Sequence, residues 1–370
     1  MYSAVKIQIA GLMLILLAVL VLPCSAKQRP NIVILLVDDL GIADIGCFGN
    51  DTIRTPHIDK LAREGAALRH NLSPAPICTP SRAAFMTGRY AVRLGMAAKP
   101  EECEVFVHNA ASGGLPQNET TFAELLSGNG YMTDHGPHLH QFNQKGKNIG
   151  GWKGNFRGGK GNNWEGGIRV PTLVRWPSHI ESGINITEPT NNFDIFSTIA
   201  DMTGIPEPAD RIIDGKSLLP LLTKQEEYSA HEFMYHYCGK DIHAVRYRPK
   251  RGKSIWKAVF KTPNPAFFDV LDEYKLYGCY GDKLITHKPT LLFDLTADPS
   301  ESNPFVPTKP HYNEIMKHIN KAIKHHQDTI AQVPNQLSKN IWYPWLQVCC
   351  NFPLCSCVEN NTEFVYPKLT

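Results

Sequence analysis

The sequence lacks a strong charge of either sign, and no tract of basic residues is interleaved with aromatic ones. Its 370 residues include 38 Lys and Arg against 35 Asp and Glu, which gives a formal net charge of +3. A charge this small does not indicate a polyanionic partner, so we expect no nucleic-acid ligand. Internal repeats and low-complexity blocks are also absent, and the Pro and Gly residues are scattered, as in a loop-rich globular enzyme.

Long apolar runs are absent after residue 26, but one lies before it. The run covers residues 7–23, follows Lys6 and ends in the small residues Cys24-Ser25-Ala26. This pattern predicts a secretory signal peptide over residues 1–26. An uncleaved membrane anchor is the alternative, because the run is nearly long enough to span a bilayer. The polar residues 27–29 favour cleavage, so we expect a mature protein of the secretory pathway: endoplasmic reticulum lumen, lysosome or secreted.

Four of the ten cysteines crowd a short C-terminal stretch, at Cys349, Cys350, Cys355 and Cys357. Such crowding is typical of small disulfide knots in an oxidising compartment. A zinc site is the alternative, but no histidine or CxxC pair lies nearby and the export signal opposes it. In that compartment five Asn-x-Ser/Thr sequons predict a glycoprotein; they begin at Asn50, Asn71, Asn118, Asn185 and Asn360.

An apolar, β-branched run over residues 31–37 predicts a strand buried on both faces of a parallel sheet. Asp38 and Asp39 follow directly, and polar groups just past such a strand lie where open α/β sheets bind their ligands. Thr55 and Pro56 then predict the start of a helix that ends at Gly65.

The remaining pattern alternates helices and strands. Helices are expected from Thr79 through Met86 and over residues 121–127, 193–203 and 313–326, strands at residues 170–174 and 291–295, and a Gly-rich loop between residues 136 and 167. The fold class is therefore α/β. We expect a main domain over residues 27–225 and a smaller α+β subdomain with a cysteine-rich tail over residues 226–370.

The segment Cys78-Thr79-Pro80-Ser81-Arg82 carries the clearest chemistry. Pro80 fits the first turn of a helix, so the backbone N–H groups near Cys78 would form an anion-favouring helix N-terminus. A nucleophile there, with Arg82 one turn away, suits attack on an anionic tetrahedral ester, because arginine donates to oxygens that gain charge in the transition state. A buried structural cysteine that begins an ordinary helix is the alternative.

The longer segment over residues 76–89 (PICTPSRAAFMTGR) resembles the sulfatase signature along its whole length. The resemblance extends upstream through residues 29–31 and 37–41, and downstream through residues 158–160, 164–171, 175–177 and 214–215. Residues 344–347 (PWLQ) and the cysteine cluster look most like the steryl sulfatase and arylsulfatase D/E/F/H branch. The resemblance implies an alkaline-phosphatase-like α/β fold and hydrolysis of a small-molecule sulfate ester, aryl or steroid.

In that family the formylglycine-generating enzyme oxidises the signature cysteine to formylglycine during export, and the hydrated aldehyde attacks sulfur. By position, the resemblance makes Cys78, Arg82 and Lys160 the catalytic residues, with Lys160 contacting the sulfate. It also implies a calcium site, since hard oxygen donors are what calcium requires; the matching positions are Asp38, Asp39, modified Cys78, Asp134 and His135. His135 would face the sulfate or support a ligand. Without the family, Asp38-Asp39 reads as a solvated turn and Lys160 as a solvated charge.

The resemblance also implies a disulfide pattern. It pairs Cys238 with Cys279, Cys349 with Cys355 and Cys350 with Cys357, and leaves Cys47, Cys78 and Cys103 free.

The sequence departs from the family after Thr133. A second signature, which runs from Gly-Tyr-x-Thr to Gly-Lys-x-His, begins here at residues 130–133, but Asp134-His135-Gly136 of a far later motif follows at once. The resemblance therefore implies that a large internal block is missing. In the family that block holds a catalytic lysine, two histidines and several central strands, and in the steryl sulfatase branch also a membrane-inserted hairpin. His138 and His140 lie near the join, but we do not expect them to replace those histidines, because acid–base catalysis demands hydrogen-bond reach of the ester.

Two alternatives to an active sulfatase stay open. The first is a catalytically impaired or inactive splice or gene-model variant. The second is a phosphoester hydrolase of the same superfamily, which would use Ser or Thr as nucleophile and usually zinc; Cys78 within CxPSR opposes it.

Overall fold

The computed structural model describes residues 30–97, 113–126, 151–264, 279–281 and 284–337. Residues from Val33 onward belong to one structural unit, which contains every helix and strand below. In the first part of this unit the helices are α2 (Pro56–Glu64), α3 (Cys78–Thr87), α4 (Phe122–Leu126), α5 (Glu165–Ile168), α6 (Asp194–Thr203) and α7 (Leu219–Leu222), with 3₁₀ turns η1 (Gly46–Phe48) and η2 (Ala91–Leu94).

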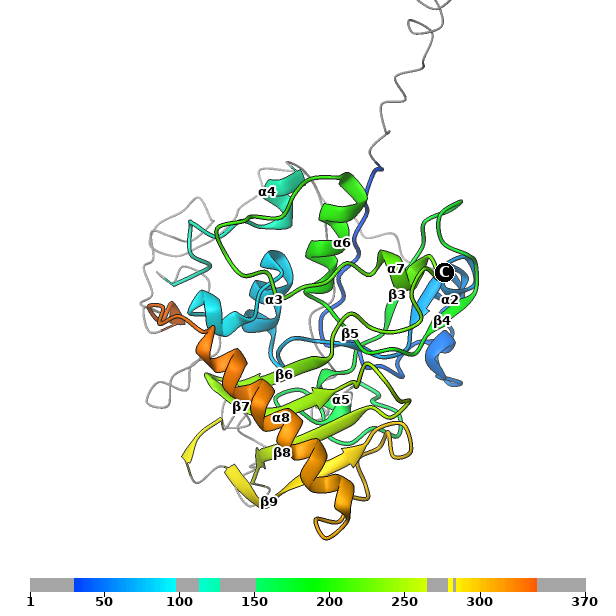
Figure 1. The fold of residues 1–370 in the computed structure, drawn as a ribbon. Helices are drawn as coiled ribbons and strands as arrows, with labels where there is room; N and C mark the ends of the chain where they lie inside the picture. Colours follow the sequence, from blue (N-terminus) through cyan, green and yellow to red (C-terminus); the bar gives the residue numbers. More distant parts are fainter. Residues whose placement is uncertain (1–29, 98–112, 127–150, 265–278, 282–283, 338–370) are drawn as a thin grey trace, which may run out of the picture. The chain divides into compact units, whose positions relative to one another are not determined.

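Two short sheets accompany these helices (Figure 1). In the first, β1 (Ala66–Leu68) pairs antiparallel with β3 (Thr172–Val174) and parallel with β4 (Ile184–Ile186). In the second, β2 (Asn71–Leu72) pairs parallel with β5 (Thr190–Asn191). Strands β1, β2 and β5 are buried along their whole length, so the N-terminal core is built around them.

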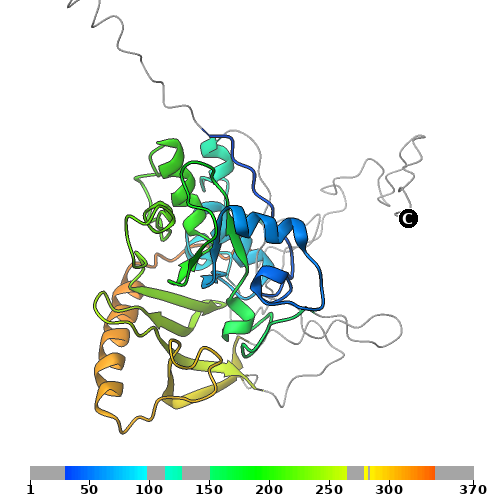
Figure 2. The same cartoon turned by 90° about the vertical axis from the view of Figure 1, so that its right-hand side faces the viewer.

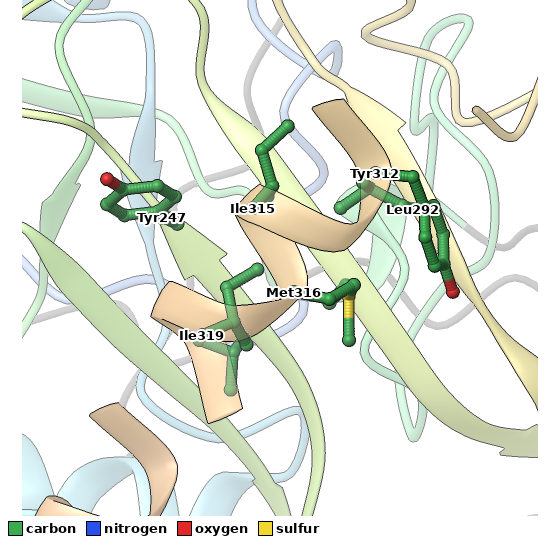
Figure 3. Close-up of a cluster of buried hydrophobic side chains, with 8 residues drawn as sticks. Tyr247, Leu292, Tyr312, Ile315, Met316 and Ile319 are labelled. Atoms are coloured by element: carbon green, nitrogen blue, oxygen red, sulfur yellow. The ribbon is translucent and has the colours of Figure 1, made fainter. Parts of the chain in front are cut away.

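A four-stranded antiparallel sheet follows, in the order β6 (Phe233–Cys238), β7 (Asp241–Tyr247), β8 (Trp256–Pro263) and β9 (Leu284–Asp294). Helix α8 (Pro310–Asp328) lies across one face of this sheet in Figure 1 and again in Figure 2. The apolar stripe of α8 recurs at spacings of three and four residues, which places it on one helix face. Figure 3 shows how this stripe packs onto the sheet; the cluster comprises Tyr312, Ile315, Met316 and Ile319 with Val245, Tyr247, Ala258 and Leu292.

The helices predicted from the sequence are confirmed within a few residues at each end. α2 begins at Pro56 as expected, but the Thr55 side chain does not cap it; its hydroxyl accepts a hydrogen bond from the Gly46 N–H and donates one to Asp59. α6 ends at Gly204, whose φ of 68° lies in the left-handed region that favours glycine. The strand expected at residues 170–174 is β3, and the one at 291–295 is the second half of β9.

The buried strand predicted over residues 31–37 is wrong. These residues form no strand, and Val33, Leu35 and Val37 are exposed by 83%, 70% and 44%. The β-branched, apolar pattern describes side chains that suit a buried sheet, but a strand exists only when another strand pairs with it. In the part of the chain that the structure describes, no strand pairs with this segment.

Within the described residues, the cysteine pattern agrees with the prediction. Cys238 and Cys279 form a disulfide, and Cys47 and Cys78 form none. The signal peptide, Cys103, the four tail cysteines and Asn360 lie outside the described residues, so those predictions stay predictions. In the described ranges, no helix is both long and apolar enough to cross a membrane.

One of the five sequons is buried in the fold. Asn71 lies in β2 with an exposed fraction of 1%, and its Nδ2 donates to Thr172 Oγ1 at 2.8 Å and to Asn192 Oδ1 at 2.6 Å. A glycan on that nitrogen would break both hydrogen bonds and could not fit in the core, so this fold is incompatible with glycosylation at Asn71. Asn118 and Asn185 are exposed and Asn50 is partly exposed.

Candidate active site

Cys78 is the first residue of α3. Ile77 before it is extended, and the Ser81 N–H donates to the Ile77 carbonyl at 3.1 Å to close the first turn. Ser81 is buried and its hydroxyl shares a 2.7 Å hydrogen bond with Ser73 Oγ. The start of the helix is thus fixed from its buried side. Cys78 is partly exposed at the end of α3 where backbone N–H groups lack intrahelical partners, as the sequence predicted.

Asp38 contacts both Cys78 and Arg82. The Cys78 Sγ lies 3.9 Å from Asp38 Oδ1, and Arg82 Nη2 lies 3.0 Å from Asp38 Oδ2. Arg82 stands one helical turn after Cys78 on the same face, so both side chains reach one carboxylate. The charged groups are 46% and 54% exposed. An ion pair that exposed adds little stability, so its main consequence is to place a guanidinium beside the cysteine.

Asp39 pairs with Lys160. Its φ of 59° is left-handed, a conformation that aspartate tolerates better than most residues. Lys160 Nζ lies 2.8 Å and 3.1 Å from the two Asp39 carboxylate oxygens, and the lysine side chain is only 11% exposed. The structure therefore joins two residues that are 121 positions apart in the sequence.

The loop that carries Lys160, residues 157–163, docks beside the segment that precedes α3. The Gly161 N–H donates to the Pro76 carbonyl at 2.9 Å, which places the loop two residues from Cys78. Gly158 and Gly161 have φ values of 78° and 90°. Glycine adopts this left-handed conformation without strain, so the path of the loop explains the glycines on both sides of Lys160.

Five of the seven residues predicted for the site thus lie together: Asp38, Asp39, Cys78, Arg82 and Lys160. Asp134 and His135, and also His138 and His140, lie outside the described residues, so their predicted roles stay untested. Arg82 and the start of α3 lie near the thiol, and Lys160 is bound to Asp39, the neighbour of Asp38. Two cations and a helix N-terminus favour an anionic tetrahedral group. The partners of the two cations are the carboxylates of Asp38 and Asp39.

The two carboxylates fit calcium in kind, because calcium prefers hard oxygen donors. They do not complete a site, since calcium takes about six to eight oxygens. Among the residues that can be described, no group of three or more His, Cys, Asp or Glu side chains is placed to hold a metal. Asp134 and an oxygen on modified Cys78 would have to supply further ligands.

The sequence reasoning missed a buried ion cluster behind the Lys160 loop. Glu165, Arg246, Lys257 and Glu301 are all fully buried or nearly so and are joined by ion pairs. The only sequence signal was Glu165 itself, within the segment Trp164-Glu165-Gly166-Gly167 that resembles the family. Arg246 and Lys257 lie in strands and Glu301 follows a turn. A single charged residue in such a segment gives no sequence signal that it is buried.

Comparison with solved structures defines the class of fold. The PsFucS1 sulfatase from Pseudoalteromonas sp. is similar with a TM-score of 0.64 at 20% identity, covering 84% of this chain and 92% of that chain. A phosphonate monoester hydrolase of Agrobacterium radiobacter is similar with a TM-score of 0.51 at 14% identity, covering 81% of this chain and 96% of that chain. The fold is the alkaline-phosphatase-like fold of the sulfatases, as expected.

Sequence comparison gives the family. The sulfatase family model matches residues 30–148 and 131–205, and the model for the C-terminal region of aryl-sulfatase matches residues 229–357. Human steryl-sulfatase is 31% identical, covering 90% of this chain and 94% of the relative; human arylsulfatase D is 29% identical, covering 94% and 96%. The chain belongs to the sulfatase family, whose members are sulfuric ester hydrolases.

The same comparisons support the prediction that an internal block is missing. Ninety per cent of 370 residues is about 333, so the alignment of 549 positions with human steryl-sulfatase leaves about 216 positions without a residue of this chain. The sulfatase model matches twice, and both matches include residues 131–148. That stretch contains the join predicted after Thr133.

Proposed function

We propose that this chain is an arylsulfatase-type or steryl-sulfatase-type hydrolase that uses formylglycine at position 78 and calcium. The observation that supports this most strongly is that Asp38, Asp39, Cys78, Arg82 and Lys160 meet from three separate segments of the chain. The names of the relatives, steryl-sulfatase and arylsulfatase D, favour an aryl or steroid sulfate as substrate.

Each residue has a distinct role in this proposal. Arg82 and Lys160 donate to the sulfate oxygens, and the N-terminus of α3 adds a further favourable field for the anion. Position 78, once oxidised to formylglycine and hydrated, would supply the hydroxyl that attacks sulfur. Asp38 and Asp39, with Asp134, would hold calcium, which would neutralise part of the sulfate charge. Asp39 also orients Lys160 until an anion competes for the ammonium group.

An impaired enzyme is the second candidate function, and two observations favour it. By the family resemblance, the missing block would contain the lysine and two histidines that serve acid–base catalysis and sulfate contact. Residues 31–37, which lead into Asp38 and Asp39, form no strand. A site on an unpaired segment holds its geometry less precisely than one on a strand. We therefore propose that the chain binds sulfate but hydrolyses sulfate esters slowly.

The class of ester rests on the nucleophile rather than on the fold. A phosphonate hydrolase has the same fold, so the architecture alone does not choose between sulfur and phosphorus. Cys78 within Cys-Thr-Pro-Ser-Arg is the substrate of the formylglycine-generating enzyme in sulfatases, and a phosphoester hydrolase of this superfamily would have Ser or Thr there.

The compartment and the domain layout belong to the same proposal. Oxidation of Cys78 occurs during export, which agrees with a signal peptide over residues 1–26 and with residence in the endoplasmic reticulum lumen, lysosome or outside the cell. We keep residues 27–225 as the catalytic domain and residues 226–370 as the C-terminal subdomain, whose sheet begins with β6.

The test is mass spectrometry of protein exported from cells that contain the formylglycine-generating enzyme. Trypsin releases residues 70–82, and the mass of this peptide distinguishes cysteine from formylglycine. We expect formylglycine, because the modifying enzyme reads a short linear segment before folding and the missing block does not touch it. An unmodified cysteine in cells that modify a control sulfatase would contradict the proposal, and Arg82→Lys serves as the variant that disrupts the motif.

A further inference from the structure

The loop that carries Lys160 rests on α5. The Gly166 N–H donates to the Arg157 carbonyl at 2.7 Å, and a Cβ added at Gly167 would lie 2.3 Å from the Gly159 carbonyl oxygen and 2.2 Å from that of Asn162. Both glycines of α5 are therefore needed for the loop backbone to approach so closely. Any shift of α5 would move residues 157–163 with it.

Helix α5 is in turn held by its first residue. Glu165 has an exposed fraction of 0%, and its Oε1 accepts from Lys257 Nζ at 2.9 Å and from Arg246 Nη2. Its Oε2 lies 3.3 Å from Arg169 Nε. Burial alone would raise the pKa of Glu165, but Arg246, Lys257 and Arg169 hold that pKa well below its usual value. The carboxylate stays charged and bound to three cations.

Glu301 completes the anchor from a third segment. Its Oε2 accepts the Glu165 N–H at 2.7 Å, its Oε1 lies 2.7 Å from Lys257 Nζ, and its backbone carbonyl accepts from Arg157 Nη1 at 3.3 Å. Arg157 begins the Lys160 loop, so the loop is tied at both ends to the same cluster. Arg246 and Lys257 belong to β7 and β8, so the C-terminal sheet supports this anchor.

We propose that Glu165 is a positioning residue for Lys160: through α5 and the glycine contacts, the buried cluster of Glu165, Arg246, Lys257 and Glu301 transmits the position of the C-terminal sheet to the lysine that faces the sulfate. Glu165 itself touches neither the anion nor Lys160. This proposal rests on the proposed function in one respect only, that Lys160 contacts the sulfate, and the loop geometry can be tested without turnover.

The first experiment measures hydrogen exchange in the full chain by mass spectrometry. Glu165→Gln keeps the shape of the side chain but removes its charge, and we expect exchange in peptides covering residues 157–163 to become at least about tenfold faster. Peptides from α2 and α8 should exchange as before. The matched control is Glu181→Gln, which breaks the exposed pair with Lys224 and should leave residues 157–163 unchanged.

The second experiment is a double-mutant cycle on the affinity for inorganic sulfate, measured by calorimetry. Lys160→Met should weaken binding about tenfold, since it removes a charge-assisted contact, and Glu165→Gln should weaken it as well. The double variant should bind no more weakly than Lys160→Met alone, because Glu165 acts only through the lysine. Independent, additive losses would show a merely structural role and overturn the proposal.

Two further measurements keep the outcome decisive. If Glu165→Gln does not fold, Glu301→Gln serves in its place, because it removes the negative charge that pairs with Lys257 and accepts the Glu165 N–H. The wild type in low urea also reports the coupling directly. There the amides of residues 161–162 should open together with those of β7 and β8; independent opening would overturn the proposal. If wild type binds no sulfate, the proposed function fails, while the exchange data still decide the role of Glu165.

Discussion

Four buried histidines should make this protein less stable when the pH is lowered from 7 to 5. Burial is the main cause that lowers their pKa in each case: to about 4 for His243, to about 3 for His326, and well below the usual value for His70 and His236. Nearby cations add to the effect, for example Arg246 beside His236 and Arg93 beside His326. In the folded protein these histidines therefore stay neutral at pH 5.

The sign and size follow from proton linkage. The unfolded chain binds protons at these histidines below about pH 6.5, whereas the folded chain does so only below the lowered pKa values. The stabilisation is present above pH 6.5 and is lost as the pH falls toward the folded pKa. When the pH falls from 7 to 5, each histidine lowers the free energy of unfolding by about 2 kcal/mol, and the four together lower it by at most about 8 kcal/mol. Glu301 opposes part of this loss, because burial raises its pKa. A typical domain has only about 5–15 kcal/mol to lose.

The assay is urea unfolding followed by circular dichroism at constant ionic strength between pH 5 and 7.5. We expect the unfolding midpoint to fall steeply below pH 6.5. His326→Gln removes one buried imidazole. It should reduce the slope of the unfolding free energy against pH by about 1.4 kcal/mol per pH unit. His311→Gln, at a side chain that is 75% exposed, is the matched control and should not change the slope. Equal stability at pH 5 and 7 would refute the reasoning.

Three other predictions concern activity, modification and packing. The purified chain should hydrolyse a fluorogenic aryl sulfate at least about a thousandfold more slowly than a full-length relative, because each missing acid–base group contributes about 10²–10⁴-fold; a rate near that of the relative, abolished in Cys78→Ala, would show that other residues have replaced them. Glycopeptide mapping of exported protein should find glycans among Asn50, Asn118 and Asn185 but not at Asn71, so an occupied Asn71 in folded protein would contradict the buried β2. Ile319→Ala should lower the free energy of unfolding by about 2–5 kcal/mol, because Ile319 is fully buried between α8 and the sheet. Lys317→Ala on the exposed face of α8 should change it by less than about 0.5 kcal/mol. Equal effects would mean that α8 does not pack as described.

The chemical identity of the site could be read from the sequence. Cys78, Pro80, Ser81 and Arg82 are neighbours in the chain, and the start of a helix at that point depends on local backbone preferences. The same holds for α2 after Pro56 and for the end of α6 at Gly204, because each signal lies within a few residues of its effect. Resemblance to the family added the pairing of Cys238 with Cys279, which no local pattern contains.

Only the tertiary structure decided which residues and segments are paired or buried. Residues 31–37 read as a buried strand, yet no described strand pairs with them, and Val33, Leu35 and Val37 are exposed. Asn71 read as a modification site, yet β2 buries it between Thr172 and Asn192. Glu165 read as one letter of a motif, yet it neutralises Arg246 and Lys257 some 80 to 90 residues away. A sequence specifies local backbone choices and side-chain chemistry, whereas burial, ladder pairing and charge compensation depend on contacts between residues far apart in the chain.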